Sequence, residues 1–159
     1  MIRIIGIGSP FGEDVIGIRV AEALAAGKLP KRFAQLDTRI CTADRPGPGL
    51  LELMADTDHV ILVDAMISGE RPGTGHWLAP EQIPEGSAGS SSHGFGLAQA
   101  LALGRSLGRL PARVEIYAIE IRSAGLSSLA PGSDNAREHA VVQRAVSDIL
   151  QRLHELAND

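Results

Sequence analysis

The sequence predicts an α/β fold, with a single three-layer domain over residues 1–159, a twisted and mostly parallel central sheet, and helices on both faces. Strand-like and helix-like segments alternate along the whole chain, as they do in doubly wound sheets. The segments 2–8 and 60–63 are almost continuously apolar, which is typical of strands buried on both faces. Carboxylates follow both segments, namely Glu13-Asp14 and Asp64, so acids are expected at one edge of the sheet.

The chain begins with a strand over residues 1–7, which is rich in isoleucine. Glycines and a proline in residues 8–12 end this strand. Asp14 then stands where the N-cap of a helix is expected, and apolar residues recur at helical spacing over residues 15–26.

The next elements are a second strand over residues 35–42, which alternates with period two, and a short helix over residues 50–55. The sequence Gly47-Pro48-Gly49 opens this helix, and Asp56-Thr57-Asp58 ends it. A third strand over residues 59–64 has the apolar character of a buried strand.

The second half of the chain predicts a strand over residues 75–79 and a mobile loop over the small, polar residues 86–92. A helix follows over residues 93–107, and a strand over residues 113–121. The segment 132–156 contains a long amphipathic helix, because its apolar residues recur at helical spacing.

The composition excludes several classes of protein. Of the 159 residues, 44% are hydrophobic and 21% charged, as in a globular domain with a full core. The net charge is −4 and only 3% of residues are aromatic, so neither charge nor stacking favours nucleic acid. The single cysteine, Cys41, excludes an internal disulfide and is expected to be a buried, inert thiol. Residues 2–7 are too short for a signal peptide, and no apolar run approaches the roughly 20 residues of a membrane helix. We therefore expect a cytoplasmic protein that does not enter a membrane.

Four residues are candidates for a site at the carboxyl edge of the sheet: Asp14, Asp64, His93 and Asp44. Ligands bind at this edge in α/β proteins, and one histidine with two or three carboxylates is able to bind a divalent metal. Each residue also has a structural alternative. Asp14 is a possible helix cap, Asp64 and Asp44 are possible turn residues, and His93 is a possible cap or core histidine.

Other patterns give weaker indications. The spacing Gly6-x-Gly8-x-x-x-Gly12 differs from the G-x-G-x-x-G of a dinucleotide-binding loop. Asp37 is expected inside the second strand and not at its end, where an acid would bind the ribose, and acids in the loop would repel a pyrophosphate. These observations disfavour nucleotide binding. Of the remaining histidines, His59 is expected at the opposite edge of the sheet and His76 in a strand. His139 and His154 are expected on a solvated face of the last helix. Neither G-x-S-x-G nor H-E-x-x-H occurs, so serine-hydrolase and zincin chemistry are not supported.

In their order along the chain, these motifs resemble the hydrogenase maturation endopeptidases, which process the large subunit of [NiFe] hydrogenases. The likeness spans nearly the whole chain. The segments that carry it are IIGIGSPFGEDVIGIRVAEAL (4–24), DRPGPGLLELM (44–54), HVILVDAMISGERPGTG (59–75), SHGFGLAQAL (92–101), VEIYAIEI (114–121) and GLS (125–127).

The resemblance implies an α/β fold and a metal-contacting set of Asp14, Asp64 and His93, with Asp44 as a further acid. The chain departs from the family pattern at Ser9, where asparagine is usual, and at Val15, where glycine is common. The first loop is also one residue shorter than in well-known members, which makes Glu13 a rival of Asp14 as the ligand.

The resemblance further implies that the protein cuts the large-subunit precursor near its C-terminus after nickel insertion, with the nickel supplied by the substrate. Asp14, Asp64 and His93 would hold this nickel, and Asp44 would act as a base or an orienting group. Two alternatives stay open: a non-catalytic module that senses the loaded precursor, and a small nucleotide-binding protein.

Overall fold

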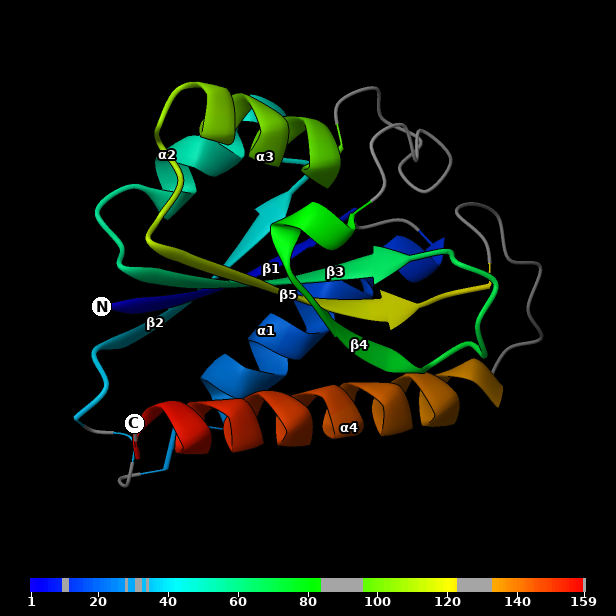
Figure 1. The fold of residues 1–159 in the computed structure, drawn as a ribbon. Coiled ribbons are helices and arrows are strands. Elements are labelled where there is room, and N and C mark those ends of the chain that lie inside the picture. Colours follow the sequence, from blue (N-terminus) through cyan, green and yellow to red (C-terminus); the bar gives the residue numbers. More distant parts are fainter. Residues whose placement is uncertain are drawn as a thin grey trace.

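Five strands form one sheet in the order β2-β1-β3-β5-β4 in this computed structural model (Figure 1). The parallel strands are β1 (Ile2–Gly8), β2 (Thr38–Asp44), β3 (His59–Met66) and β5 (Arg113–Glu120), and β4 (Gly75–Leu78) runs antiparallel at the edge. The structure describes residues 1–9, 12–27, 29–30, 33, 35–83, 96–122 and 133–158. The mostly parallel sheet predicted from the sequence is confirmed.

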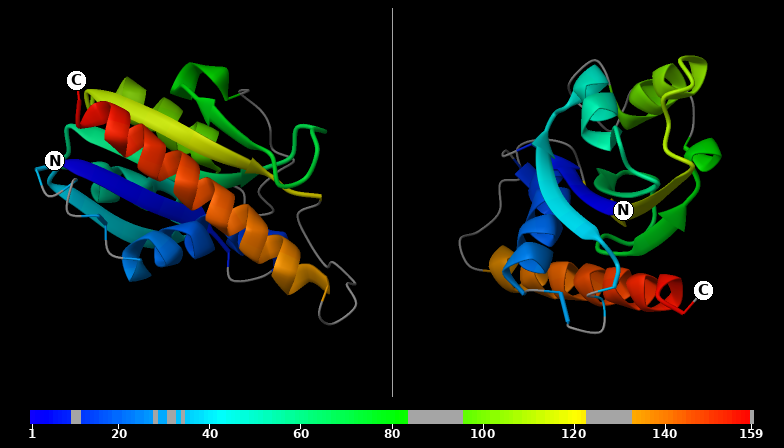
Figure 2. Two further views of the ribbon diagram at one scale, coloured as in Figure 1. Left: turned by 90° about the horizontal axis from the view of Figure 1, so that it is seen from below. Right: turned by 90° about the vertical axis from the view of Figure 1, so that its left-hand side faces the viewer.

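Helices cover both faces of the sheet. The helices α1 (Ile16–Ala26) and α4 (Ser133–Leu156) lie on one face, and α2 (Leu50–Met54) and α3 (Leu97–Ser106) lie on the other (Figure 1). The right-hand view of Figure 2 shows the same three layers from the side. None of the helices in the described part of the chain has the length and apolar character needed to cross a membrane.

Two apolar cores hold these layers together, one on each face. Because successive side chains of a strand point to opposite faces, neighbouring residues of β1 and β3 contribute to different cores. Ile4, Ile61 and Val63 pack with α1 and α4, whereas Ile5 and Leu62 pack with α2 and α3. Strands that must be apolar on both faces explain why these segments read as continuous apolar runs.

The boundaries of two strands differ from those predicted. β2 begins at Thr38 rather than residue 35, so Asp37 precedes the strand, and its carbonyl accepts a hydrogen bond from the Ile2 N–H at 2.7 Å. β3 continues two residues beyond Asp64, to Met66, because β5 keeps pairing with it up to Met66 opposite Glu120. Asp64 therefore lies within a strand and not in a turn.

Two helices begin later than predicted. α1 starts at Ile16, and its N-cap is Val15, which makes no side-chain capping bond. Asp14 lies in the preceding 3-10 turn η1 (Gly12–Val15), so the structural alternative, in which Asp14 caps α1, is wrong. α3 starts at Leu97 rather than residue 93, because Gly96 has an extended backbone. The predicted loop 86–92 lies outside the described residues.

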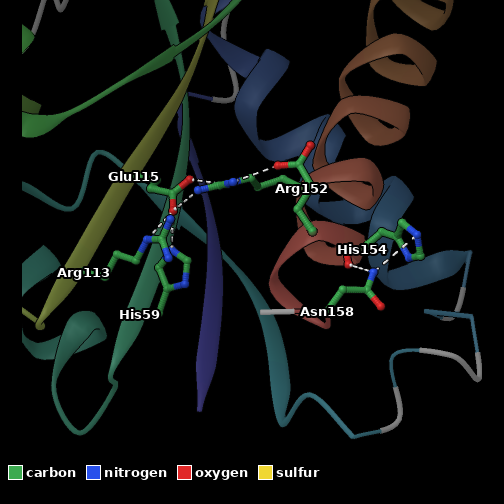
Figure 3. A network of polar contacts seen from close by, with 7 residues as sticks. His59, Arg113, Glu115, Arg152, His154 and Asn158 are labelled. Atoms are coloured by element: carbon green, nitrogen blue, oxygen red, sulfur yellow. Dashed lines mark hydrogen bonds and ion pairs between the residues drawn. The ribbon is translucent and has the colours of Figure 1, made fainter.

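A polar network joins β3, β5 and α4 at the amino end of the sheet (Figure 3). The carboxylate of Glu115 lies 3.0 Å from His59 Nε2, 2.6 Å from Arg113 Nε and 2.7 Å from Arg152 Nε. Burial alone would raise the pKa of Glu115, but the hydrogen bonds from Arg152 and the positive charges around it lower the pKa on balance. His59 thus lies at the edge opposite the carboxyl ends of the strands, as predicted.

Candidate functional site

A cavity of about 500 Å³ lies at the carboxyl ends of the parallel strands. From β1, the chain passes to β2 on one side, and β3 occupies the other side of β1. Such a reversal of strand order leaves a crevice where ligands bind in α/β proteins. Asp14 and Asp64 both line this cavity.

Close packing of α1 against the sheet positions Asp14. A Cβ atom on Gly17 would lie 2.2 Å from the Ile7 carbonyl oxygen and 2.4 Å from that of Val63, so only glycine permits this approach. A Cβ atom on Gly8 would likewise lie 2.2 Å from the Asp14 carbonyl oxygen. Gly8 and Gly17 therefore allow η1 and α1 to pack closely on the sheet, and this packing places the turn η1 at the ends of β1 and β3.

Asp64 occupies the first position of β3 beyond its ladder with β1, which ends at Gly6 opposite Val63. Its side chain is partly buried, and its Oδ1 accepts a hydrogen bond from the Ala65 N–H at 2.9 Å. Burial and the negative charge of Asp14 raise the pKa of Asp64 to about 7, against the opposing effect of the Ala65 hydrogen bond. The two carboxyl groups are therefore close enough to influence each other electrostatically.

This pair of carboxyl groups supports two kinds of chemistry. A divalent cation between them would remove their mutual repulsion and would be held by oxygen ligands. Without a cation, a carboxyl group with a pKa near neutrality is suited to accept or donate a proton. In the described ranges, no three His, Cys, Asp or Glu side chains gather into a metal site.

The structure does not bring Asp44 into this cavity wall. Asp44 ends β2 and is exposed, and its carboxylate accepts hydrogen bonds from Arg45 at 2.6 and 3.2 Å. Arg45 itself lines the cavity, and its backbone N–H donates to the Gly8 carbonyl at 2.9 Å. Its backbone is in the left-handed region, with φ of 44°. Arg45 is not among the residues predicted from the sequence, although it directly follows an acid at the end of a strand.

The remaining predicted ligands stay predictions. His93 lies outside the described residues, and only the backbone of Glu13, within η1, is described. Asp14 thus remains the candidate of the first loop that lines the cavity, and Glu13 remains its rival.

Glu120 is a second residue near the site that is not among those predicted from the sequence. It ends β5 and is only 2% exposed. Its carboxylate accepts hydrogen bonds from the Ser68 N–H at 2.8 Å, the Ser68 hydroxyl at 2.7 Å and the Gly69 N–H at 3.0 Å. Burial would raise the pKa of Glu120, but these hydrogen bonds lower it on balance. Its position directly after the apolar run 116–119 could have indicated it, because Asp64 follows the apolar run 60–63 in the same way.

Other residues singled out in the sequence lie away from the two acids. His76 lies in β4, and His139 and His154 are exposed on α4, as predicted. Cys41 is half-buried in β2, and burial raises the pKa of its thiol despite the nearby charge of Arg3. The predicted full burial of Cys41 is therefore wrong, and its inertness stays a prediction.

Comparisons with known proteins agree with this architecture. Residues 18–152 match the sequence model of the hydrogenase maturation protease family. The chain is 30% identical over 121 residues to the hydrogenase 2 maturation protease of Escherichia coli (strain K12), which covers 74% of this chain and 71% of the relative.

Two solved structures extend the comparison to the fold. The hydrogenase-maturating endopeptidase HybD of E. coli superposes with a TM-score of 0.72 and 27% identity, over 97% of this chain and 92% of that protein. The [NiFe] hydrogenase maturation protease HycI of Thermococcus kodakarensis gives a TM-score of 0.61 at 21% identity, over 99% and 92% of the two chains. This second similarity supports the fold.

Proposed function

The chain belongs to the hydrogenase maturation protease family, and from this membership we propose that it removes the C-terminal extension of a [NiFe] hydrogenase large-subunit precursor after nickel insertion. The observation that carries the proposal is the meeting of Asp14 and Asp64 in one cavity at the carboxyl edge of the sheet. The proposed reaction is the hydrolysis of one peptide bond in the precursor, and the proposed location is the cytoplasm.

The nickel in this proposal is part of the substrate. Asp14, Asp64 and His93 would contact it, and the precursor would supply the remaining ligands. Two carboxylates and one imidazole form a weak site alone, so tight binding would require a precursor that already contains the metal. The protease would therefore recognise nickel loading and the polypeptide together.

The residues of the cavity have distinct parts in this scheme. The raised pKa of Asp64, about 7, keeps its carboxyl group partly protonated at neutral pH until a cation favours the ionised form. The ionised pair then orients the loaded precursor against the sheet edge. Nickel at this position would polarise the scissile carbonyl or lower the pKa of a water. Arg45 adds a positive charge at the cavity wall and, through its ion pair, links Asp44 to it.

A second candidate function uses the same residues without cutting. A non-catalytic module would bind the loaded precursor through Asp14 and Asp64 and hold it for another enzyme. Family membership favours the protease. A nucleotide-binding protein is disfavoured, because Asp14 and Asp64 in the cavity would repel phosphates, and because Gly6 and Gly8 pack closely against α1 and η1.

The test is to incubate the protein with nickel-loaded and with nickel-free precursor and to follow the mass of each. Loss of a C-terminal peptide from the loaded form alone is the expected result. Binding without cleavage of the loaded form would favour the non-catalytic module. Equal cleavage of both forms would keep the protease and overturn the role of substrate nickel.

A further inference from the structure

The cavity has two chemically different ends. Its charged residues lie at one end: Arg45 follows β2, Asp14 lies in the turn after β1, and Asp64 lies in the middle strand β3. The apolar end has side chains from the end of β3, from β4 and the turn after it, and from the start of α3: Met66, Ile67, Leu78, Ile83 and Leu97. We propose, on the basis of the proposed function, that this apolar end is a subsite for a hydrophobic side chain of the precursor close to the scissile peptide bond.

The polar side chains at this end each take part in a local hydrogen bond. Gln82 accepts a hydrogen bond from the Ala79 N–H at 2.7 Å, and Gln99 accepts one from the Gly96 N–H at 2.9 Å. The Ser68 hydroxyl donates to Glu120. No charged side chain lines this end among the residues that the structure describes.

One wall of the subsite is held in place before any substrate arrives. Beyond Asp64, the chain continues through Met66 and Ile67 to Ser68 and Gly69, where Glu120 holds it with three hydrogen bonds. The Met66 carbonyl also accepts a hydrogen bond from the Ile121 N–H at 2.9 Å. A preformed wall lowers the entropic cost of binding, so Glu120 is a positioning residue for the subsite.

Ile67 lies next to this hydrogen-bonded segment, and its side chain is 40% exposed on the wall. Covering exposed apolar surface is favourable, and a ligand gains this free energy only if it presents an apolar group. The cavity volume of about 500 Å³ lies within the range of roughly 300–1,000 Å³ for ligand pockets. It therefore has room for more than a metal ion.

A polypeptide that carries a metal centre and an apolar residue near the cut satisfies both ends of the cavity. A metal ion alone would use only the carboxylates. A nucleotide would place phosphates against Asp14 and Asp64. The occupant of the apolar end is thus a side chain of the precursor itself.

The experiment compares Ile67→Glu with the control Leu107→Glu in steady-state cleavage of nickel-loaded precursor. Leu107 likewise has an exposed apolar side chain, 55% accessible, but it caps the end of α3 and does not line the cavity. For Ile67→Glu we expect KM to rise about tenfold or more, with kcat within about threefold of wild type. Leu107→Glu should behave as wild type. An unchanged KM for Ile67→Glu, or the same change in both variants, would overturn the subsite.

A second series separates contact from indirect structural effects. Residues on either side of the cut in the precursor are changed to lysine one at a time. One of these precursors should be cleaved poorly by the wild-type protein and better by Ile67→Glu, because opposite charges then meet in the subsite. If no lysine precursor reverses the preference, Ile67 does not contact the substrate.

Failure of the subsite differs from failure of the proposed function. If the wild-type protein binds the loaded precursor without cutting it, the proposed function fails. The Kd of Ile67→Glu and Leu107→Glu for the loaded precursor then tests the subsite in place of KM. If the wild-type protein neither binds nor cuts the loaded precursor, both proposals are overturned.

Discussion

Asp64 lies inside a buried strand, and it also lines the cavity. Asp64→Asn keeps the size of the side chain and its acceptor for the Ala65 N–H, but removes the negative charge. We expect it to abolish processing of loaded precursor and to leave the fold intact, as measured by precursor mass and circular dichroism. Asp56→Asn, at an exposed turn, is the matched control and should process normally. Processing at the wild-type rate by Asp64→Asn would remove Asp64 from the site.

The raised pKa of Asp64 also predicts how stability depends on pH. The unfolded chain loses this proton near the ordinary value of 3.8, whereas the folded chain loses it near 7. Between these values the folded state binds more protons, so stability falls as pH rises through this window. Asp64→Asn lacks the titration, and its stability relative to wild type should increase by roughly 2–4 kcal/mol from pH 4 to pH 8. Urea unfolding at both pH values measures this, and a constant difference would contradict it.

At the scale of residues, the sequence predicted where a site residue lies along a strand better than it predicted which other residues surround it. A carboxylate directly after a buried strand had to emerge at the sheet edge, which is why Asp64 could be identified. The cavity walls come from segments far apart in sequence, such as Ile67, Leu78 and Leu97, and no local pattern brings these together. Asp44 follows the same strand-end rule, but it is exposed, pairs with the guanidinium of Arg45 and does not line the cavity.

At the scale of elements, the contact between α1 and the sheet determines where Asp14 lies. Gly17→Ala would place a methyl group against the Ile7 and Val63 carbonyls and push the helix outwards. We expect a loss of about 1–3 kcal/mol in the free energy of unfolding, together with slower processing because η1 moves with the helix. Urea unfolding and cleavage assays measure the two effects.

Gly49→Ala provides the control for this prediction. A Cβ atom there would meet no other atom within 4 Å, and the backbone φ of Gly49 is −63°. Alanine should therefore be neutral or stabilise by about 0.4–1 kcal/mol. Equal effects of the two substitutions would show that close packing of α1 is not what requires Gly17.

Element types were predictable, and element boundaries were less so. A strand or helix that is buried in the core needs apolar residues at a fixed spacing, so the element type can be read from the spacing. The ends depend on partners elsewhere in the chain: β3 extends to Met66 because β5 pairs with it that far. The later start of α3 reflects the extended backbone of Gly96, which the helical spacing of the following residues does not reveal.

At the scale of the whole molecule, the two ends of the sheet have different tasks. The carboxyl end holds acids that repel each other and weaken the fold, which is the arrangement expected of a binding site. The amino end holds Glu115 among His59, Arg113 and Arg152, where opposite charges meet. This separation predicts that substitutions at the two ends will affect stability and activity in opposite ways.

Glu115→Gln tests that separation. It removes the charge that pairs with Arg113 and Arg152, and we expect a loss of about 1–3 kcal/mol in unfolding free energy with an unchanged rate of processing. Because the pKa of Glu115 is lowered in the folded state, the loss should be present at neutral pH and fade as pH falls below the ordinary value of 4.5. Glu155→Gln, which removes an exposed partner of Arg152, should cost less than about 0.5 kcal/mol. If Glu115→Gln abolished processing while the protein stayed folded, the amino end of the sheet would be coupled to the cavity, and the two ends would not be independent.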